Sequence, residues 1–347
     1  MELKNFVFLV NVLCWGGYLV SFGMIKDTFP TVNCGYVSSK GHRTNQRDAV
    51  VHSSFVVHAV SYDMAMICDG CGKDNFAVNV VKDNMSGALQ MALCNSQNDV
   101  KMAILWAFDN CEEVILKRQE DTLNASGVRI FLSLWDLTHK KEYLAQLGDC
   151  RLYILDNFRN IICETRDHKP SDKKEKTYIE RCGGRVRYNG TYVGLISDNP
   201  AAYGLTTSRA LGCAHLKQNK EYLYRPKRGP VNAVPDVWYL DLQGSGAVEM
   251  LITSGYTKIV DAYQDKEAVK ICLRDAFSLS GEDFYNKYKC FKNDDSLWQF
   301  KVDVEDCKGD TCWSYVAARI IYALPYFLGQ NKKMDNVTIL LRSCYWQ

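Results

Sequence analysis

The spacing of apolar and polar residues predicts strands that come in groups, separated by a few long helices. In residues 49–70, β-branched and aromatic side chains fill two apolar runs around a short turn, which favours a pair of strands. Further strands are expected at residues 34–41, 126–137, 142–150, 151–157, 236–242, 247–255 and 336–344, the three between 126 and 157 forming a meander. Because the strands do not alternate with helices, the pattern favours an α+β fold.

Three segments are predicted to be helices: residues 99–118, 169–184 and 312–329. The first has the clearest helical period, with apolar side chains on one face at Val100, Ile104, Phe108, Cys111 and Ile115. Asn98 or Asp99 can cap its start. In the second helix, Ser171 is suited to be the N-cap and Gly183 to follow the last turn.

Composition excludes several classes of protein. The residues are 47% hydrophobic and 24% charged, which is typical of a globular chain. A net charge of +2 gives no electrostatic reason to expect a nucleic-acid partner. The 15 cysteines are dispersed and odd in number, which favours reduced thiols in the cytoplasm over a disulfide framework. No pair of histidines completes a zinc site with any pair of these cysteines.

The N-terminal segment is ambiguous. Residues 6–23 are almost entirely apolar, so they fit a signal peptide, a membrane anchor that leaves the domain in the cytosol, or a segment packed on the protein. We therefore divide the chain into an apolar segment at 1–33 and a domain at 34–347. Residues 277–313 are polar with scattered aromatic side chains, and they are expected to be an insertion in that domain.

Three aspartates stand at the ends of apolar strands. They occur in the pairs Asp69-Gly70, Gly148-Asp149 and Asp335-Asn336. Carboxylates that converge from strand ends on one rim are suited to bind Mg²⁺ or Mn²⁺. Each aspartate alone is equally an ordinary turn residue.

A series of segments, in order along the chain, resembles the metal-dependent protein phosphatases of the 2C type. The segments are GYVSSKGHRTNQRDA (35–49), ICDGCG (67–72), AQLGDCRLYIL (145–155), TRDHKP to IERCGGRV (165–186), LTTSRALGCAHLK (205–217), MLITSGYTKIVD (250–261) and KKMDNVTILL (332–341). The resemblance implies two packed antiparallel sheets flanked by helices, with a metal site at one end of the sandwich.

The family's metal-binding pattern is only partly present. In such phosphatases two metal ions activate a bridging water that attacks phosphorus. The resemblance implies that Asp69, the Gly70 carbonyl and Asp335 match metal ligands, and that Arg43 matches a phosphate-binding arginine. Where the family has acidic residues or histidine, this chain has Arg47, Cys71, Cys213, Ser254 and Lys258.

These replacements predict a degenerate site. We expect Arg47 or Lys258 to lie near Asp69 and Asp335 as an internal ion pair in place of metal, so that no cofactor is required. The alternative is that both cations point outward and leave a weak site for Mg²⁺ or Mn²⁺. Arg43 is expected either to bind phosphate or to form a structural ion pair.

The resemblance then implies a pseudophosphatase and not an enzyme. The chain is similar to the member of the family that serves as an adaptor for TGF-beta-activated kinase, through Ser254, Gly255 and Lys258 and through residues 100–116 and 337–343. We therefore expect a protein-binding adaptor or regulator in a kinase pathway of the MAP kinase kinase kinase type, with a protein kinase or another signalling protein as partner. The alternatives are a weakly active Mn²⁺- or Mg²⁺-dependent Ser/Thr phosphatase and a phosphopeptide-binding module.

Overall fold

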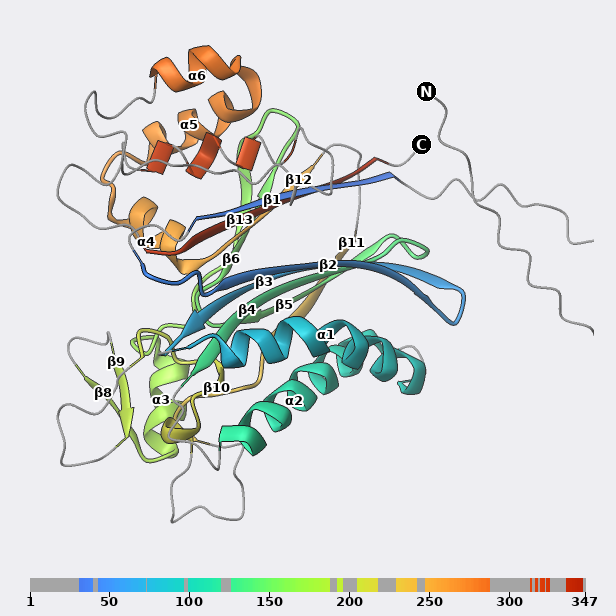
Figure 1. The fold of residues 1–347 in the computed structure, drawn as a ribbon, viewed down its shortest axis with the longest axis vertical. Helices are drawn as coiled ribbons and strands as arrows, with labels where there is room; N and C mark the ends of the chain where they lie inside the picture. The colour runs from blue at the N-terminus through green and yellow to red at the C-terminus, as the bar shows by residue number, and fades with distance from the viewer. Residues whose placement is uncertain are drawn as a thin grey trace, which may run out of the picture.

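The molecule is an α+β sandwich, as the strand grouping predicted, with helices outside two packed antiparallel sheets (Figure 1). It is seen here in a computed structural model. The structure describes residues 31–39, 43–72, 74–96, 99–119, 126–187, 192–195, 205–217, 229–241, 247–287 and 335–345, together with 313, 316–317, 319–321 and 323–324.

The first sheet has the strand order β11-β5-β4-β3-β2, and β10 pairs with β4 beside this path. Its strands are β2 (Asp48–Val57), β3 (Val60–Cys71), β4 (Gly127–Asp136), β5 (Lys141–Leu147), β10 (Leu211–Gly212) and β11 (Asp236–Asp241). The central strands β3 and β4 are buried along most of their length because both faces of the sheet are covered.

The second sheet has the order β1-β13-β12-β6-β7. Its strands are β1 (Thr31–Ser39), β6 (Arg151–Leu155), β7 (Ile161–Glu164), β12 (Val248–Ile252) and β13 (Val337–Tyr345). A separate hairpin joins β8 (Gly184–Arg187) and β9 (Tyr192–Leu195). β1 therefore begins at Thr31, three residues before the boundary expected at residue 34.

Helices cover the outer faces of both sheets (Figure 1). The helices are α1 (Phe76–Asn95), α2 (Val100–Gln119), α3 (Lys173–Arg181), α4 (Ser254–Ala262), α5 (Lys266–Ser278) and α6 (Gly281–Lys287), with a 3-10 turn at Ala214–Leu216. The pair α1 and α2 packs on the first sheet, and α4 and α5 pack on the second. Residues 281–287 of the expected insertion are thus helical, while 288–312 lie outside the described residues.

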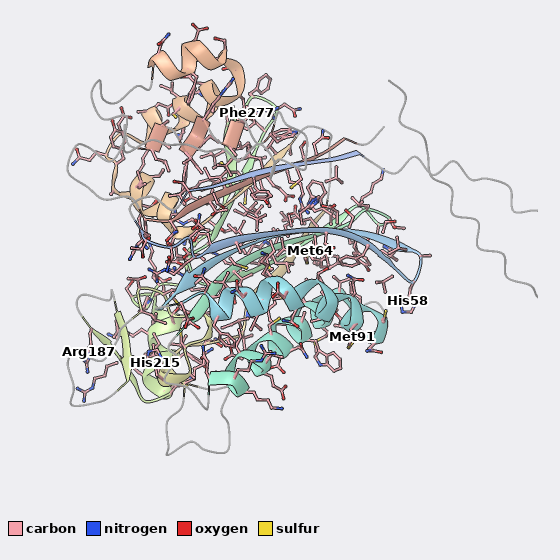
Figure 2. All side chains as sticks on the ribbon, in the orientation of Figure 1. His58, Met64, Met91, Arg187, His215 and Phe277 are labelled. Carbon is pink, nitrogen blue, oxygen red and sulfur yellow. The ribbon has the colours of Figure 1, made fainter. Side chains whose placement is uncertain are left out.

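The core forms three apolar layers that follow from the two-residue period of the strands. Met64 and Met66 on β3 face α1 and α2, whereas Ala65 and Ile67 face the other sheet. Figure 2 shows Met64 on the helix side of the first sheet and Phe277 in the helical layer over the second. The central strands of both sheets are therefore buried on each face.

Four sequence-based expectations need correction. The meander stops at β5: Gly148, with φ of +99°, redirects the chain, and β6 joins the second sheet beside β12. The 20-residue helix α1 was not expected. Asp172, not Ser171, is the N-cap of α3. The strand expected at residues 247–255 ends at Ile252, and α4 begins at Ser254.

The apolar segment at residues 6–23 lies outside the described residues. Within the part of the chain that is described, no helix is both long and apolar enough to cross a membrane.

Candidate functional site

The acidic rim of the sandwich is built by strands from both sheets. Asp48 on β2 lies opposite Asp69 on β3 in the antiparallel register. The backbone N–H of Ser254, at the start of α4, donates to Asp69 Oδ2 at 3.0 Å. Asp335 lies two residues before the start of β13, which pairs with β12 on one side. The fold thus brings together residues that the sequence separates by more than 280 positions.

The principal cation of this rim is Arg129, which the sequence analysis did not single out. Arg129 lies opposite Asp69 in the β3–β4 register, and its guanidinium binds Asp69 Oδ1. The same guanidinium lies 3.1 Å from the carboxylate of Asp149, in the turn between β5 and β6. All three side chains are buried. One internal guanidinium therefore bridges two of the three strand-end aspartates.

The electrostatics of Arg129 agree with this geometry. Burial lowers the pKa of its guanidinium, but the charges of Asp149 and Asp69 outweigh burial and hold the pKa well above its ordinary value. A signal for this role was present in the sequence, because GVRIFLSL places one charged residue inside an otherwise apolar strand. Such a residue needs a charged partner when it is buried.

Asp48 is a carboxyl group without a cation. Its Oδ2 accepts hydrogen bonds from Thr253 Oγ1 at 2.8 Å and from Thr338 Oγ1 at 2.9 Å, while its buried Oδ1 has no hydrogen-bond partner. Burial, and then the charge of Asp69, raise the pKa of Asp48 well above its ordinary value. The charged form of Asp48 is therefore disfavoured relative to an exposed aspartate, which weakens this carboxyl as a metal ligand.

Asp335 is held by two further side-chain cations. Arg43 binds it with two hydrogen bonds, from Nε to Oδ1 at 2.7 Å and from Nη2 to Oδ2 at 2.9 Å. Lys258 Nζ lies 3.8 Å from Asp335 Oδ2 and also donates to Ser254 Oγ at 3.2 Å. Burial raises the pKa of Asp335, but Arg43, the Asn336 backbone N–H and Lys258 hold it at about 2.

The sequence analysis expected Arg47 or Lys258 beside Asp69 and Asp335; Lys258 lies beside Asp335, whereas Arg47 turns to the backbone. Its guanidinium donates to the carbonyl of Gly72, and its own carbonyl accepts from the N–H of Gly70 at 3.0 Å. It therefore fastens the chain before β2 to the end of β3, and no ion pair with Asp69 or Asp335 is found. The physical reason is that Arg129, from the adjacent strand β4, already occupies the space beside Asp69.

The two cysteines that replace the family's polar residues are neighbours. Cys71 ends β3 and Cys213 precedes the 3-10 turn, and their sulfur atoms are 3.8 Å apart. The structure thus brings two groups of the predicted site residues together. The acidic group gathers Asp69, Ser254, Lys258, Asp335 and Arg43, and the thiol group pairs Cys71 with Cys213.

The residues present do not fit a site for two divalent cations. Within the described ranges, no three His, Cys, Asp or Glu side chains are grouped so that they could hold a metal ion. Asp69 and Asp149 are bound by Arg129, Asp335 by Arg43 and Lys258, and Asp48 is bound by threonine hydroxyls. A divalent cation would have to displace the buried guanidinium of Arg129 at Asp69 and Asp149, and the half-exposed Arg43 and Lys258 at Asp335.

The two antiparallel sheets, the flanking helices and the acidic rim define the class of a phosphatase-like β-sandwich. The sequence profile of the family Protein phosphatase 2C matches residues 34–279, and the chain belongs to this family.

Named relatives and solved structures agree with this assignment. The chain is 26% identical to Probable protein phosphatase 2C 76 of Arabidopsis thaliana over 71% of its own length and 52% of that protein. It is 26% identical to Protein phosphatase 1L of Bos taurus over 70% of its own length and 63% of that protein. It therefore spans about half to two thirds of the length of these relatives.

Among solved structures, a serine-threonine phosphatase 2C from Toxoplasma gondii matches with a TM-score of 0.61 at 17% identity, covering 92% of this chain and 96% of that one. A sex determining protein of C. elegans matches with a TM-score of 0.59 at 16% identity, covering 90% of this chain and 64% of that one. At this level of identity the structural likeness establishes the shared fold.

Proposed function

We propose that this chain is a catalytically inactive member of its family that acts as a protein-binding adaptor or regulator in a kinase pathway. The observation that carries the proposal is the charge balance of the rim. Asp69, Asp149 and Asp335 are each bound by a cationic side chain of the chain itself. A metal-activated water requires carboxylates that are free to bind the metal.

The energetic argument rests on Arg129. To bind metal at Asp69, the chain would have to release the buried guanidinium of Arg129, which would then keep only Asp149 as a partner. Breaking a buried ion pair by removing one partner costs about 3–5 kcal/mol. Lys258 adds a positive charge near Asp335, which opposes a second cation. The proposal therefore predicts that Mg²⁺ and Mn²⁺ bind weakly or not at all.

The partner is proposed to be a protein kinase of the MAP kinase kinase kinase type or another signalling protein. The support is the resemblance of Ser254, Gly255, Lys258 and the helix α2 to the adaptor for TGF-beta-activated kinase, combined with rim carboxylates that are paired with cationic side chains. A protein kinase as partner favours a cytoplasmic location for the domain. A membrane contact through residues 6–23 remains the alternative.

Mn²⁺ calorimetry together with hydrolysis of p-nitrophenyl phosphate tests the inactive state. The expected result for the full chain is no saturable Mn²⁺ binding and no turnover. The matched variant combines Arg129→Thr, Ser254→Asp and Lys258→Asp, which removes two cations and adds carboxylates, and it should gain Mn²⁺ affinity. Tight binding of two Mn²⁺ ions with turnover by the unaltered chain would overturn the proposal.

A weakly active phosphatase is the second candidate, and one observation favours it. Asp48, Asp69, Asp149 and Asp335 are all present at the rim, so four carboxyl groups remain there although other acidic positions of the family pattern are replaced. The relatives named above are called phosphatases. High Mn²⁺ concentration would be needed to compete with Arg129, so turnover that rises steeply with Mn²⁺ would favour this candidate.

Binding of a phosphopeptide through Arg43 is the third candidate. The Arg43 side chain is 49% exposed, which leaves it accessible. However, Asp335 already occupies two of its nitrogen atoms, so a phosphate would have to displace that carboxylate. Arg43→Ala should abolish phosphopeptide binding if this candidate is right, and Arg47→Ala is the matched control. Equal binding by Arg43→Ala and the unaltered chain would exclude it.

A further inference from the structure

The pair Cys71 and Cys213 is a second chemical feature beside the rim, independent of whether metal binds there. Cys71 is the last residue of β3, and Cys213 follows β10 and precedes the 3-10 turn. The two sulfur atoms are 3.8 Å apart, although 141 residues separate them in the chain. We propose that Cys71 and Cys213 form an oxidisable dithiol, which a peroxide converts to a disulfide.

Gly127 makes the contact between the two sulfurs possible. In the β3–β4 register Gly127 lies opposite Cys71, and on the other side of β4 it lies opposite Gly212. A Cβ atom at Gly127 would overlap Cys213 Sγ and would lie 3.0 Å from Cys71 Sγ. The space that a side chain would fill on β4 is therefore filled by the two thiols, which approach each other over a bare backbone.

The two thiols differ in access, and this difference gives each one a role. Cys213 is fully buried, whereas Cys71 is half-buried. A small oxidant therefore reaches Cys71 first, and Cys213 is already in position to react next. Bond formation requires the sulfurs to move from 3.8 Å to about 2.05 Å. Rotation of the Cys71 side chain about its Cα–Cβ bond can supply part of that movement.

The oxidation proceeds in two steps with hydrogen peroxide as oxidant. First, Cys71 sulfur attacks one peroxide oxygen: an S–O bond forms, the O–O bond breaks, and the thiol proton leaves with the departing hydroxide as water. Second, Cys213 sulfur attacks the sulfenic sulfur of Cys71: an S–S bond forms, the S–O bond breaks, and the hydroxyl leaves with the Cys213 proton as water. Two electrons pass from sulfur to peroxide overall.

The disulfide would tie the end of β3 to the segment at residues 205–217. That segment is fastened to the protein by the buried ion pair between Lys217 and Glu112 of α2. The cross-link would therefore hold Cys71, beside the rim, to a segment that the ion pair of Lys217 already fixes to α2. Because a disulfide restricts the unfolded chain, the oxidised protein should unfold at a higher temperature.

Peptide mapping of the folded full-length chain tests this inference. The protein is treated with hydrogen peroxide, free thiols are blocked with N-ethylmaleimide, and a digest is analysed by mass spectrometry. The expected result is a Cys71–Cys213 cross-linked peptide that disappears after reduction with dithiothreitol. The thermal midpoint of the oxidised protein should rise, and reduction should reverse the rise.

Two variants sharpen the test. In Cys213→Ser, Cys71 should be trapped by dimedone as sulfenic acid, and peroxide should no longer raise the thermal midpoint. In Cys94→Ser, which removes an exposed cysteine, the cross-link should form as in the unaltered chain. Recovery of Cys71 and Cys213 as blocked thiols after peroxide, or a cross-link from Cys71 to another cysteine, would overturn the proposal. Neither result depends on Mn²⁺ binding or on phosphatase activity.

Discussion

At the scale of single residues, the rim shows how one side chain can determine the chemistry of several others. Arg129 neutralises Asp69 and Asp149 at once, and both acids are buried. Without it, their charges would face each other across a space that water scarcely reaches. The charge balance of the rim thus depends on Arg129, which lies outside the motifs that identify the family.

We expect Arg129→Met to destabilise the protein by about 3–5 kcal/mol, because it removes one partner from buried ion pairs. Urea unfolding measures the change. Added Mn²⁺ should recover more stability in this variant than in the unaltered chain, because two carboxylates are released. The control is Arg43→Met, whose exposed ion pair should contribute less than about 1 kcal/mol. A loss no greater than that of the control would contradict the assigned role of Arg129.

Asp335 provides a prediction about acid stability. Its pKa is about 2 in the folded protein against an ordinary value of 3.8. A carboxyl whose folded pKa is lowered stabilises the protein above its unfolded pKa, and this contribution is lost as pH falls through the folded pKa. The stability advantage of the unaltered chain over Asp335→Asn should therefore be constant above about pH 5 and shrink toward about pH 2. Urea unfolding at several pH values measures it; an advantage that does not change with pH would contradict the ion pair.

At the scale of elements, α1 shows why a helix can be overlooked in a sequence. Val81, Met85, Leu89 and Leu93 recur at helical spacing and are buried against the first sheet. The interior also contains Gly87 and several β-branched residues, which have weak helix propensity. Packing on the sheet and on α2 stabilises α1 where propensity does not.

Helix capping gives a prediction at this scale. Asp265 is the N-cap of α5, and its carboxylate accepts a hydrogen bond from the N–H of Ala268 at 3.0 Å. Asp265→Ala should therefore cost about 1 kcal/mol of stability, as measured by urea unfolding. Asp172→Ala is the matched control, because Asp172 is the N-cap of α3 but makes no capping hydrogen bond. Equal losses in the two variants would show that the capping hydrogen bond contributes nothing.

At the scale of the whole molecule, Arg342 links the two sheets through the centre of the sandwich. It extends from β13 of the second sheet and binds Asp63 of the first at 2.9 Å, and it also binds Glu249 of β12 at 2.8 Å. Its guanidinium stacks on the ring of Trp135 at 3.7 Å from the ring centre. The side chain is fully buried, so these partners replace all of its hydration.

Arg342→Met should destabilise the protein by about 3–5 kcal/mol, because Asp63 and Glu249 would be left buried with less compensation. Urea unfolding measures the loss. The double variant Arg342→Met with Asp63→Asn should recover part of it, since one unpaired charge is then removed. If the double variant loses the sum of the two single effects, the pair is not coupled and the link between the sheets is not electrostatic.

The local pattern of residues in the sequence was sufficient to predict most strands and helix α2, and to find the order of motifs that identifies the family. It also marked Asp69 and Asp335 as strand-end acids, whereas Lys258 was singled out through the family resemblance. Such features depend on residues within a few positions of one another, where the two-residue and 3.6-residue periods can be read directly.

Only the tertiary structure decided which cation neutralises which acid. Arg129 is 60 residues from Asp69 and meets it because the β3–β4 register sets them opposite each other, while Arg47, only 22 residues away, turns to the Gly72 carbonyl. The change of sheet after Gly148 likewise depends on pairing with β12, nearly 100 residues later. Register and sheet membership arise from contacts between distant segments, and a one-residue shift would exchange the face of every side chain.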